Sequence, residues 1–354
     1  MGKISLAHNG NLINTSKIKK ELTENGSLFQ TTTDTEIILK LLGKNAKYGY
    51  KKSLLNMLDK VEGAFALVII IENKLIGIRD PHGIRPLCLG ETSDGLYVLA
   101  SESCALDALG ANFLRDIEPG EMVIIDNNEI ESIKYKVNSI KSPCSFEFIY
   151  FARPDSIIDG IDVYSVRHEA GRALYEQNPI EADIVIGVPD SGIPAAIGYS
   201  EISGIPYGAA LVKNKYIGRT FISPSQELRE KSVKVKLNPI KDLIEGKRLV
   251  VIDDSLVRGT TSKKLIKMLL DSGAKEVHFR SASPVVKNEC YFGVDIAEKK
   301  ELIGSFMEVE KIKEEIGATT LEYLSLDNLS KILKSNDFCM GCFTGKYPIK
   351  NMEI

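Results

Sequence analysis

Two acidic residues and a cluster of hydroxyl groups follow one short apolar run in this chain. Leu249 to Ile252 precedes Asp253 and Asp254, and the polar loop after them contains Ser255, Gly259, Thr260, Thr261 and Ser262. A phosphate dianion binds to the free N–H groups and positive dipole end at the start of a helix, with help from hydroxyl donors. Neighbouring carboxylates can hold ribose hydroxyls or a Mg²⁺ ion. The segment therefore predicts a sugar phosphate site, and an ordinary strand-to-helix loop is the alternative.

A second polar turn, formed by Asp190, Ser191 and Gly192, precedes this segment in the chain. It lies between a predicted strand at 183–188 and a predicted helix at 193–202. Ligands of parallel α/β sheets bind at the C-terminal ends of the strands, and both turns are expected at that edge. Taken alone, this turn is better explained as a structural β–α turn. The two turns together favour ligand binding.

The residues around these turns alternate between strand and helix patterns. Strands are predicted at 183–188, 207–212, 249–252 and 277–282, and helices at 166–177, 193–202 and 262–270. Such alternation predicts βαβ units, and therefore a parallel sheet covered by helices on both faces. The basic, polar segment 213–236 between the two turns has no clear periodicity, and we expect it to form a lid.

The first part of the chain has a different pattern. A helix is predicted at 34–43, with Thr33 or Asp34 as its N-cap, and strands at 63–71, 75–80, 96–101 and 121–126. A turn of Glu72, Asn73 and Lys74 joins the first two strands, and short connections of this kind predict an antiparallel sheet. The composition changes at 138–145. We therefore expect an α+β domain at 1–140 and an α/β domain at 141–354.

The overall composition is typical of a soluble globular protein. Of the 354 residues, 44% are hydrophobic and 26% are charged, and the net charge of −3 gives no sign of a nucleic-acid partner. The longest apolar run, Ala64 to Ile71, is too short to span a membrane, and no secretory signal is visible. We expect a cytoplasmic protein with neither a membrane nor a nucleic-acid partner.

Several longer motifs resemble those of one enzyme family. IYFARPDSIIDGIDVYSVR, GVPDSG, KNKYIGRTFI, VIDDSLVRGTTS and CFTGKYP occur in the order found in glutamine phosphoribosylpyrophosphate (PRPP) amidotransferases. SLAHNGNL, TTTDTE, DPHGIRPL and ASESCALD agree with the first part of that family. The resemblance implies an N-terminal-nucleophile glutaminase domain of αββα type, followed by a phosphoribosyltransferase domain. It also implies formation of 5-phosphoribosylamine and pyrophosphate from PRPP and glutamine, the first step of purine biosynthesis.

The resemblance implies roles for the residues of both turns. Asp190, Ser191 and Gly192 would bind the pyrophosphate of PRPP, and Asp253 and Asp254 would secure the ribose. Mg²⁺ would bind to Ser191, Asp253 and Asp254. The 5′-phosphate site would be the loop and helix start formed by Ser255, Gly259, Thr260, Thr261 and Ser262. In the lid, the residues expected to act on the departing pyrophosphate are Lys213, Tyr216 and Arg219.

The first domain carries only part of the expected glutaminase chemistry. Asn9 and Gly10 resemble oxyanion donors, and Asp34 resembles the carboxylate that holds the substrate's α-ammonium group, although Asn-Gly alone is typical of a hairpin turn. The family's nucleophile is an N-terminal Cys, whereas this chain begins with Met and has no Cys before Cys88. Cys88 and Cys104 are expected to be core thiols. We therefore expect a glutaminase domain that lacks its N-terminal part, no glutamine hydrolysis, and use of free ammonia.

The remaining cysteines include a C-x2-C pair. Cys339 and Cys342 are close in sequence, whereas Cys144 and Cys290 are remote from them and from each other. From spacing alone, a zinc site, a redox pair and buried thiols all remain possible. The family resemblance implies a structural [4Fe–4S] cluster with these four cysteines as its ligands, which would fix the C-terminal tail to the domain junction.

The resemblance further implies a homo-oligomer that is inhibited by purine nucleotides. Three other hypotheses compete with an active transferase. The chain could be a PRPP-binding regulator, a fragment that cannot fold its first domain, or a purine-salvage transferase. Pyrophosphate release from PRPP and ammonium salts would exclude the regulator, and the GTTS loop and the cysteine set argue against the salvage enzyme.

Overall fold

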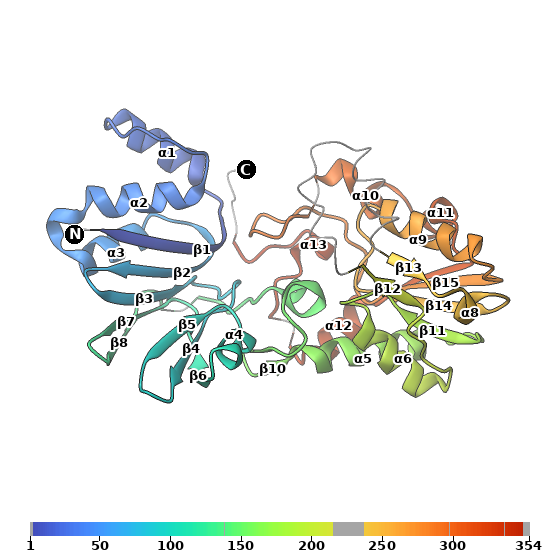
Figure 1. Cartoon of the computed structure of the whole chain (residues 1–354). Coiled ribbons are helices and arrows are strands. Elements are labelled where there is room, and N and C mark those ends of the chain that lie inside the picture. Colours follow the sequence, from blue (N-terminus) through green and yellow to red (C-terminus); the bar gives the residue numbers. More distant parts are fainter. Residues whose placement is uncertain (1–2, 138, 215–236, 297, 336, 350–354) are drawn as a thin grey trace.

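The computed structural model describes residues 3–137, 139–214, 237–296, 298–335 and 337–349, which form two halves side by side (Figure 1). Tyr216 and Arg219, which were predicted to belong to the lid, lie outside the described residues. Within these ranges, no helix combines the length and the hydropathy that crossing a bilayer requires.

The N-terminal half contains two antiparallel sheets, as the hairpin pattern predicted. The larger sheet has the strand order β1-β2-β3-β7-β8, and the smaller one has the order β5-β4-β6. The strands are β1 Ile4–Leu12, β2 Gly63–Ile71, β3 Lys74–Arg79, β4 Cys88–Thr92, β5 Tyr97–Ala100, β6 Ala111–Asp116, β7 Glu121–Asp126 and β8 Glu129–Lys134. The turn between β2 and β3 is one residue shorter than predicted, because Lys74 pairs with Ile71 and only Glu72 and Asn73 adopt positive φ angles.

Helices cover the outer faces of both sheets in the N-terminal half (Figure 1). The helices are α1 Thr15–Glu24, α2 Asp34–Lys44, α3 Tyr50–Leu58 and α4 Ser103–Ala108, with a short 3₁₀ turn at Ala46–Tyr48. Leu41 and Leu42 of α2 pack on Leu67 and Ile69 of the larger sheet, whereas Leu106 of α4 packs on the smaller one. Helix, sheet, sheet and helix layers confirm the predicted αββα class.

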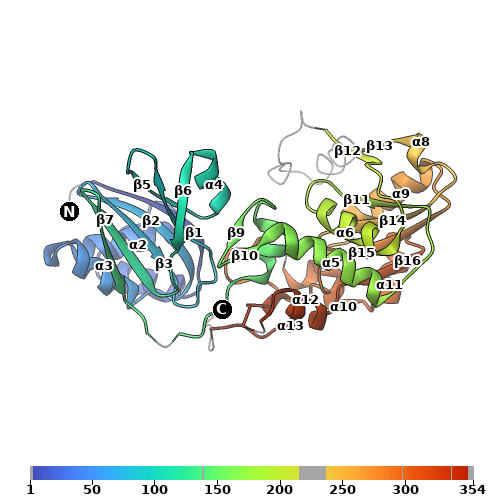
Figure 2. The ribbon, with the colours of Figure 1, turned by 90° about the horizontal axis from the view of Figure 1, so that it is seen from below.

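The C-terminal half is built on a parallel sheet with the order β11-β14-β15-β16. Its strands are β11 Ile184–Gly187, β14 Arg248–Asp253, β15 Glu276–Ser281 and β16 Thr320–Tyr323. One face packs against α5 Val163–Gln177, α6 Ile193–Ser203 and α12 Leu326–Ile332, and the other against α9 Thr260–Asp271 and α11 Val309–Ile316 (Figure 2). The predicted parallel sheet with helices on both faces is confirmed.

The remaining elements of the C-terminal half are short. They are a π-helix at Glu147–Phe151, strands β9 Ile157–Ile158 and β10 Ile161–Asp162, helices α8 Lys241–Ile244, α10 Ile303–Phe306 and α13 Gly341–Thr344, and a 3₁₀ turn at Lys299–Glu301. The strand predicted at 207–212 is only partly present, because of its residues only Leu211 and Val212 belong to a strand. Tyr207 forms only an isolated bridge with Val185, and β12 Leu211–Lys213 pairs with β13 Leu237–Pro239 in a separate antiparallel ribbon. Gly208 interrupts the run, since it has no side chain to pack in a strand.

Two buried arginines of the N-terminal half reach across to the C-terminal half. Arg79 donates to both carboxylate oxygens of Asp159 at 2.8 Å, and Arg85 donates to Glu147 at 2.6 Å. Both arginine side chains are 1% exposed and both carboxylates 6% exposed. A buried charge is tolerated only with a hydrogen-bonded partner, so these ion pairs hold the two halves in one arrangement.

Helices α5 and α6 approach each other closely through glycine. A Cβ added at Gly171 of α5 would lie 1.8 Å from the backbone oxygen of Ala195 in α6. Gly171→Ala should therefore lower the free energy of unfolding by about 1–3 kcal/mol or more, because the helices must separate. Gly43→Ala in α2 is the matched control. A Cβ there meets nothing within 4 Å, so it should stabilise by about 0.5–1 kcal/mol. Urea denaturation measures the free energy of unfolding of both variants. Equal changes in the two variants would contradict the close approach of α5 and α6.

Candidate active site

The two predicted loops meet at the C-terminal edge of the parallel sheet. The Val188 N–H donates to the carbonyl of Ile252 at 2.8 Å. A Cβ on Gly192 would lie 2.4 Å from the same carbonyl oxygen, so only glycine fits there. The Ser191 hydroxyl donates to Oδ2 of Asp254. Residues far apart in sequence thus form one continuous polar surface, as expected for a ligand that contacts both loops.

The two acidic residues after β14 have different surroundings. Asp254 is 8% exposed, and its second oxygen accepts from the Ser255 hydroxyl at 2.5 Å. Asp253 is half-buried and accepts from the Asp254 N–H at 3.0 Å. Burial and the neighbouring Asp254 raise the pKa of Asp253 well above its usual range. Burial also raises the pKa of Asp254, although hydrogen bonds from the two serines oppose it. Adjacent carboxylates that are costly to ionise are a good site for a cation.

The loop after Asp254 ends at the start of α9, where a phosphate would bind. Gly259 precedes the helix with a φ of +76°, a conformation that favours glycine. The side chains of Thr260 and Thr261 are exposed, whereas Ser262 is 4% exposed. The helix start therefore presents two hydroxyl groups together with its free N–H groups.

Asp190 and Lys213 form an ion pair at the rim of the site. Their side chains are 74% and 47% exposed, so the pair is weak and readily exchanged for a charged ligand. Lys213 ends β12 and is the first residue of the predicted lid segment 213–236, of which residues 215–236 lie outside the described part of the chain.

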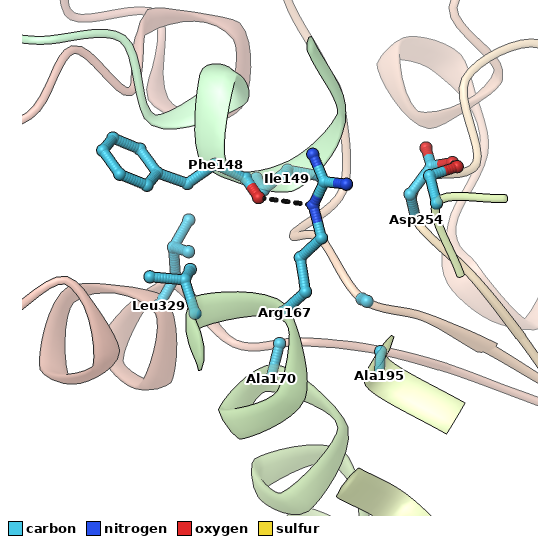
Figure 3. Close-up of a pocket in the computed structure, with 10 residues that line it drawn as sticks. Phe148, Ile149, Arg167, Ala170, Ala195, Asp254 and Leu329 are labelled. Atoms are coloured by element: carbon cyan, nitrogen blue, oxygen red, sulfur yellow. Dashed lines mark hydrogen bonds between the residues drawn. The ribbon is translucent and has the colours of Figure 1, made fainter. Parts of the chain in front are cut away.

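A small pocket, which was not predicted from the sequence, lies behind Asp254. Its lining is mostly apolar, with Phe148, Ile149, Val166, Ala170, Ala195, Ala282 and Leu329, but it also includes Arg167, Ser191 and Asp254 (Figure 3). Arg167 was missed, although a signal existed. It is a charged residue on the buried face of α5, among Val163, Val166, Ala170 and Leu174.

The predicted glutaminase residues lie on a strand and a helix start. Asn9 and Gly10 are in β1, opposite Ala66 and Phe65 of β2, so a hairpin turn at Asn-Gly is wrong. Gly10 has a φ of +138° and a Cβ there would lie 2.1 Å from the Ala64 oxygen, which requires glycine.

Asp34 begins α2, and its side chain faces β1. It accepts hydrogen bonds from the Leu12 N–H at 3.1 Å and from His8 at 3.2 Å. Burial would raise the pKa of Asp34, but these hydrogen bonds outweigh burial and lower the pKa. Thr33 is at the N-cap position but makes no side-chain capping bond. Asp34 is therefore a fixed, ionised carboxylate beside the strand that carries Asn9 and Gly10.

The C-terminal half contacts this same strand directly. The Asn11 side chain donates to the Tyr291 carbonyl at 3.0 Å, and a Cβ on Gly293 would lie 2.6 Å from the carbonyl carbon of Gly10. Segment 290–293 thus packs on the backbone of the predicted oxyanion residues.

Four cysteines from three remote segments gather near this contact. Cys144 forms a β-bridge with Cys339, and the N–H groups of Lys287 and Asn288 both donate to the Cys342 carbonyl at 2.9 Å. Cys144 and Cys342 belong to one buried hydrophobic cluster, and Cys290 and Cys339 pack against it. Cys88 and Cys104, at 2% and 5% exposure, are buried elsewhere, which confirms them as core thiols.

The surroundings of the four cysteines suit an anionic group. Burial raises the pKa of Cys339 to about 11 and that of Cys144 and Cys342 well above the usual range. The fully buried Nη2 of Arg85 has no hydrogen-bond partner among the described residues, and Cys144 and Cys290 act electrostatically on this guanidinium. In the part of the chain that the structure describes, no three His, Cys, Asp or Glu side chains are grouped to hold one metal ion.

Comparison with known proteins agrees with this arrangement. Residues 1–108 match the glutamine amidotransferase domain family, and residues 166–303 match the phosphoribosyl transferase domain family. The amidophosphoribosyltransferase of Bacillus subtilis (strain 168) is 48% identical over 353 residues, which cover 98% of this chain and 74% of the relative. The chain belongs to the amidophosphoribosyltransferase family.

Two further members support the same assignment. The amidophosphoribosyltransferase of Archaeoglobus fulgidus is 46% identical over 98% of this chain and 77% of its own length. A solved structure of the B. subtilis glutamine PRPP amidotransferase, complexed with ADP and GMP, matches with a TM-score of 0.91 at 47% identity. The match covers 99% of this chain and 78% of that one. The predicted family, and its glutaminase fold followed by a phosphoribosyltransferase fold, are therefore confirmed.

Proposed function

We propose that this chain transfers the phosphoribosyl group of PRPP to ammonia, giving 5-phosphoribosylamine and pyrophosphate, as in the first step of purine biosynthesis. The observation that carries the proposal is the bond between Ser191 and Asp254, which joins two ligand loops at one edge of the parallel sheet in a member of this family. A single extended ligand, with a phosphate at one end and a pyrophosphate at the other, fits such a pair of loops.

Each loop holds one end of PRPP. Thr260 and Thr261, with the N–H groups at the start of α9, bind the 5′-phosphate. Ser262 supports them from inside the helix, and Ser255 and Gly259 shape the loop. Asp253 and Asp254 secure the ribose hydroxyls.

Ser191, Gly192 and Asp190 hold the pyrophosphate at the other loop. Ser191, Asp253 and Asp254 would hold Mg²⁺, which neutralises part of the pyrophosphate charge when bound. The paired carboxylates and their raised pKa values fit that ion.

The reaction breaks one bond at C1 and forms another. Pyrophosphate leaves C1 with the bonding electron pair, the ammonia nitrogen donates its lone pair to C1, and the amine then loses a proton to solvent. Lys213 is placed to stabilise the departing charge by exchanging Asp190 for pyrophosphate. Tyr216 and Arg219 are proposed to assist from the lid.

The N-terminal half is proposed to be a glutaminase domain of residues 1–140, with the transferase domain at 141–354. Asn9 and Gly10 supply the oxyanion donors, and Asp34 holds the α-ammonium group of glutamine. Cys88 and Cys104 are internal and buried, so neither can supply the N-terminal thiol of such a glutaminase. We propose that residues 1–354 by themselves do not form the thioester that glutamine hydrolysis needs.

One assay tests the transferase proposal and the glutaminase proposal separately. Purified protein with PRPP, Mg²⁺ and an ammonium salt should release pyrophosphate, whereas glutamine in place of ammonium should give neither pyrophosphate nor glutamate. Absence of pyrophosphate with ammonium would reject the transferase and leave a PRPP-binding regulator. Glutamate release from glutamine would reject the inactive glutaminase without affecting the transferase.

We also propose that Cys144, Cys290, Cys339 and Cys342 hold a [4Fe–4S] cluster. Iron sites accept thiolates from remote segments, and metal binding removes the protons that these buried thiols otherwise retain. The unpartnered Nη2 of Arg85 gives the resulting anion a neighbouring cation.

The cluster proposal predicts metal content. Protein prepared without oxygen should contain iron and acid-labile sulfide in equal amounts, and Cys290→Ser should remove most of both. Cys104→Ser, which changes a core thiol outside the group, should leave them unchanged. Zinc in place of iron, or neither metal in the unaltered protein, would contradict the proposal.

Purine nucleotides are proposed as inhibitors, because the similar B. subtilis structure contains ADP and GMP. A cytoplasmic homo-oligomer is proposed from the family resemblance. Nucleotide titration of the ammonium-dependent reaction and light scattering test these two proposals.

A further inference from the structure

Arg167 is a buried cation behind the proposed PRPP site. The residue is 4% exposed, and it forms no ion pair with a carboxylate of the described residues. Its guanidinium lies between the backbone of Phe148 and the side chain of Asp254 (Figure 3). A buried charge without a paired charge is unfavourable by itself, so its position calls for a functional or electrostatic reason.

Backbone carbonyls fix this guanidinium in place. Nε donates to the Phe148 carbonyl at 2.9 Å, and Nη2 donates to the Ala152 carbonyl at 2.7 Å. Both acceptors belong to the π-helix Glu147–Phe151 or to its C-cap residue, and Arg167 itself is anchored on α5, whose N-cap Asp162 accepts from the Ser165 N–H at 2.6 Å. Two neutral acceptors orient the group without neutralising it, so its positive charge remains directed into the pocket.

The carboxylate that lines the pocket together with Arg167 is that of Asp254. Asp254 lines the pocket together with Ser191, and Asp253 is its immediate neighbour. Two adjacent carboxylates repel each other. A fixed cation on the inner side of Asp254 offsets that repulsion and leaves the outer side of the pair open to the ligand.

We propose that Arg167 is a positioning residue for PRPP binding, whose fixed positive charge holds the Asp254 carboxylate against Ser191 and so keeps the two ligand loops together. Arg167 does not touch the ligand, because it lies on the inner side of Asp254. The proposal rests on the PRPP site proposed above and adds to it a residue that acts through Asp254.

Charge and hydrogen bonding can be separated by substitution. Arg167→Gln keeps an N–H donor for the carbonyls and removes the charge, whereas Arg167→Lys keeps the charge. We expect Arg167→Gln to weaken PRPP binding at least about tenfold, measured by calorimetry with Mg²⁺, and to raise KM for PRPP with little change in kcat. Arg167→Lys should remain within about threefold of the unaltered protein in both measurements.

Arg172→Met is the matched control on the same helix. Its side chain is 36% exposed and, among the described residues, forms an ion pair with Glu169, so PRPP binding should not change. Arg167→Met serves as a second neutral variant if Arg167→Gln does not unfold cooperatively. An equal loss of PRPP affinity in Arg167→Lys and Arg167→Gln would overturn the role of the charge, and so would unchanged affinity in the neutral variants. Either result would leave the PRPP site itself in place. Failure of the unaltered protein to bind PRPP would overturn both proposals.

Discussion

Replacing Asp253 with Asn should lower pyrophosphate release from PRPP and ammonium by about a hundredfold or more, without unfolding the protein. Asp253 is half-buried at the end of β14, and its carboxylate accepts a hydrogen bond from the Asp254 N–H at 3.0 Å. A carboxylate has further lone pairs, so the group can still bind a ligand. The amide keeps the size of the side chain but loses the charge that a Mg²⁺ ion or a ribose hydroxyl would need. Removing one of two adjacent carboxylates also relieves repulsion in the free protein.

The steady-state rate of pyrophosphate release tests the predicted loss of activity, and the midpoint of urea denaturation tests the predicted stability. Asp271→Asn, at the exposed C-terminal end of α9, is the matched control and should change neither. A rate for Asp253→Asn close to that of the unaltered protein would remove Asp253 from the site.

Replacing Arg79 with Met should lower the free energy of unfolding by about 3–5 kcal/mol, because it leaves the carboxylate of Asp159 buried without its main partner. Arg79 also donates to the carbonyls of Ile117, Arg85 and Gly83 at 2.8, 2.9 and 3.0 Å. Those acceptors lie in the N-terminal half, whereas Asp159 lies in the C-terminal half. One side chain therefore stabilises both the N-terminal half and its junction with the C-terminal half.

Urea denaturation is the measurement, with Arg153→Met as the control. Arg153 pairs with Asp155 on the surface, where the two side chains are 63% and 54% exposed, and its loss should cost no more than about 0.5 kcal/mol. Similar effects of the two substitutions would mean that the junction ion pair contributes little to stability.

Local patterns predicted most of the fold. Apolar runs such as Ala64 to Ile71 and periodic helices such as 262–270 fix their own conformation, and their order along the chain determines the sheet type. Strand β16 and helices α11 and α12, which are short and lie among charged residues, were not predicted. In the N-terminal half, strands β1, β4, β6 and β8 and helices α1, α3 and α4 were not predicted either. The strand at 207–212 is only partly present, because a short apolar run does not reveal whether a neighbouring strand is available to pair with it.

The site residues also divide into those that local patterns predict and those that they do not. The phosphate and acidic loops were predicted, because each is a contiguous motif. Arg79, Arg85 and Arg167 were not, because their partners lie far away in the chain. Arg79 and Asp159 are separated by 80 positions, and Arg85 and Glu147 by 62. Only the folded structure brings such residues together, and it also identified Asp254 as the link between the two loops.

The close approach of Gly293 to Gly10 has a consequence for engineering. The strand that carries the proposed oxyanion residues is supported from the other half of the molecule. A chimera that grafts this N-terminal module onto an unrelated acceptor domain would therefore lose that support, even if the grafted module folded correctly. Exchange between relatives should succeed only when the partner brings its own glycine to the matching place.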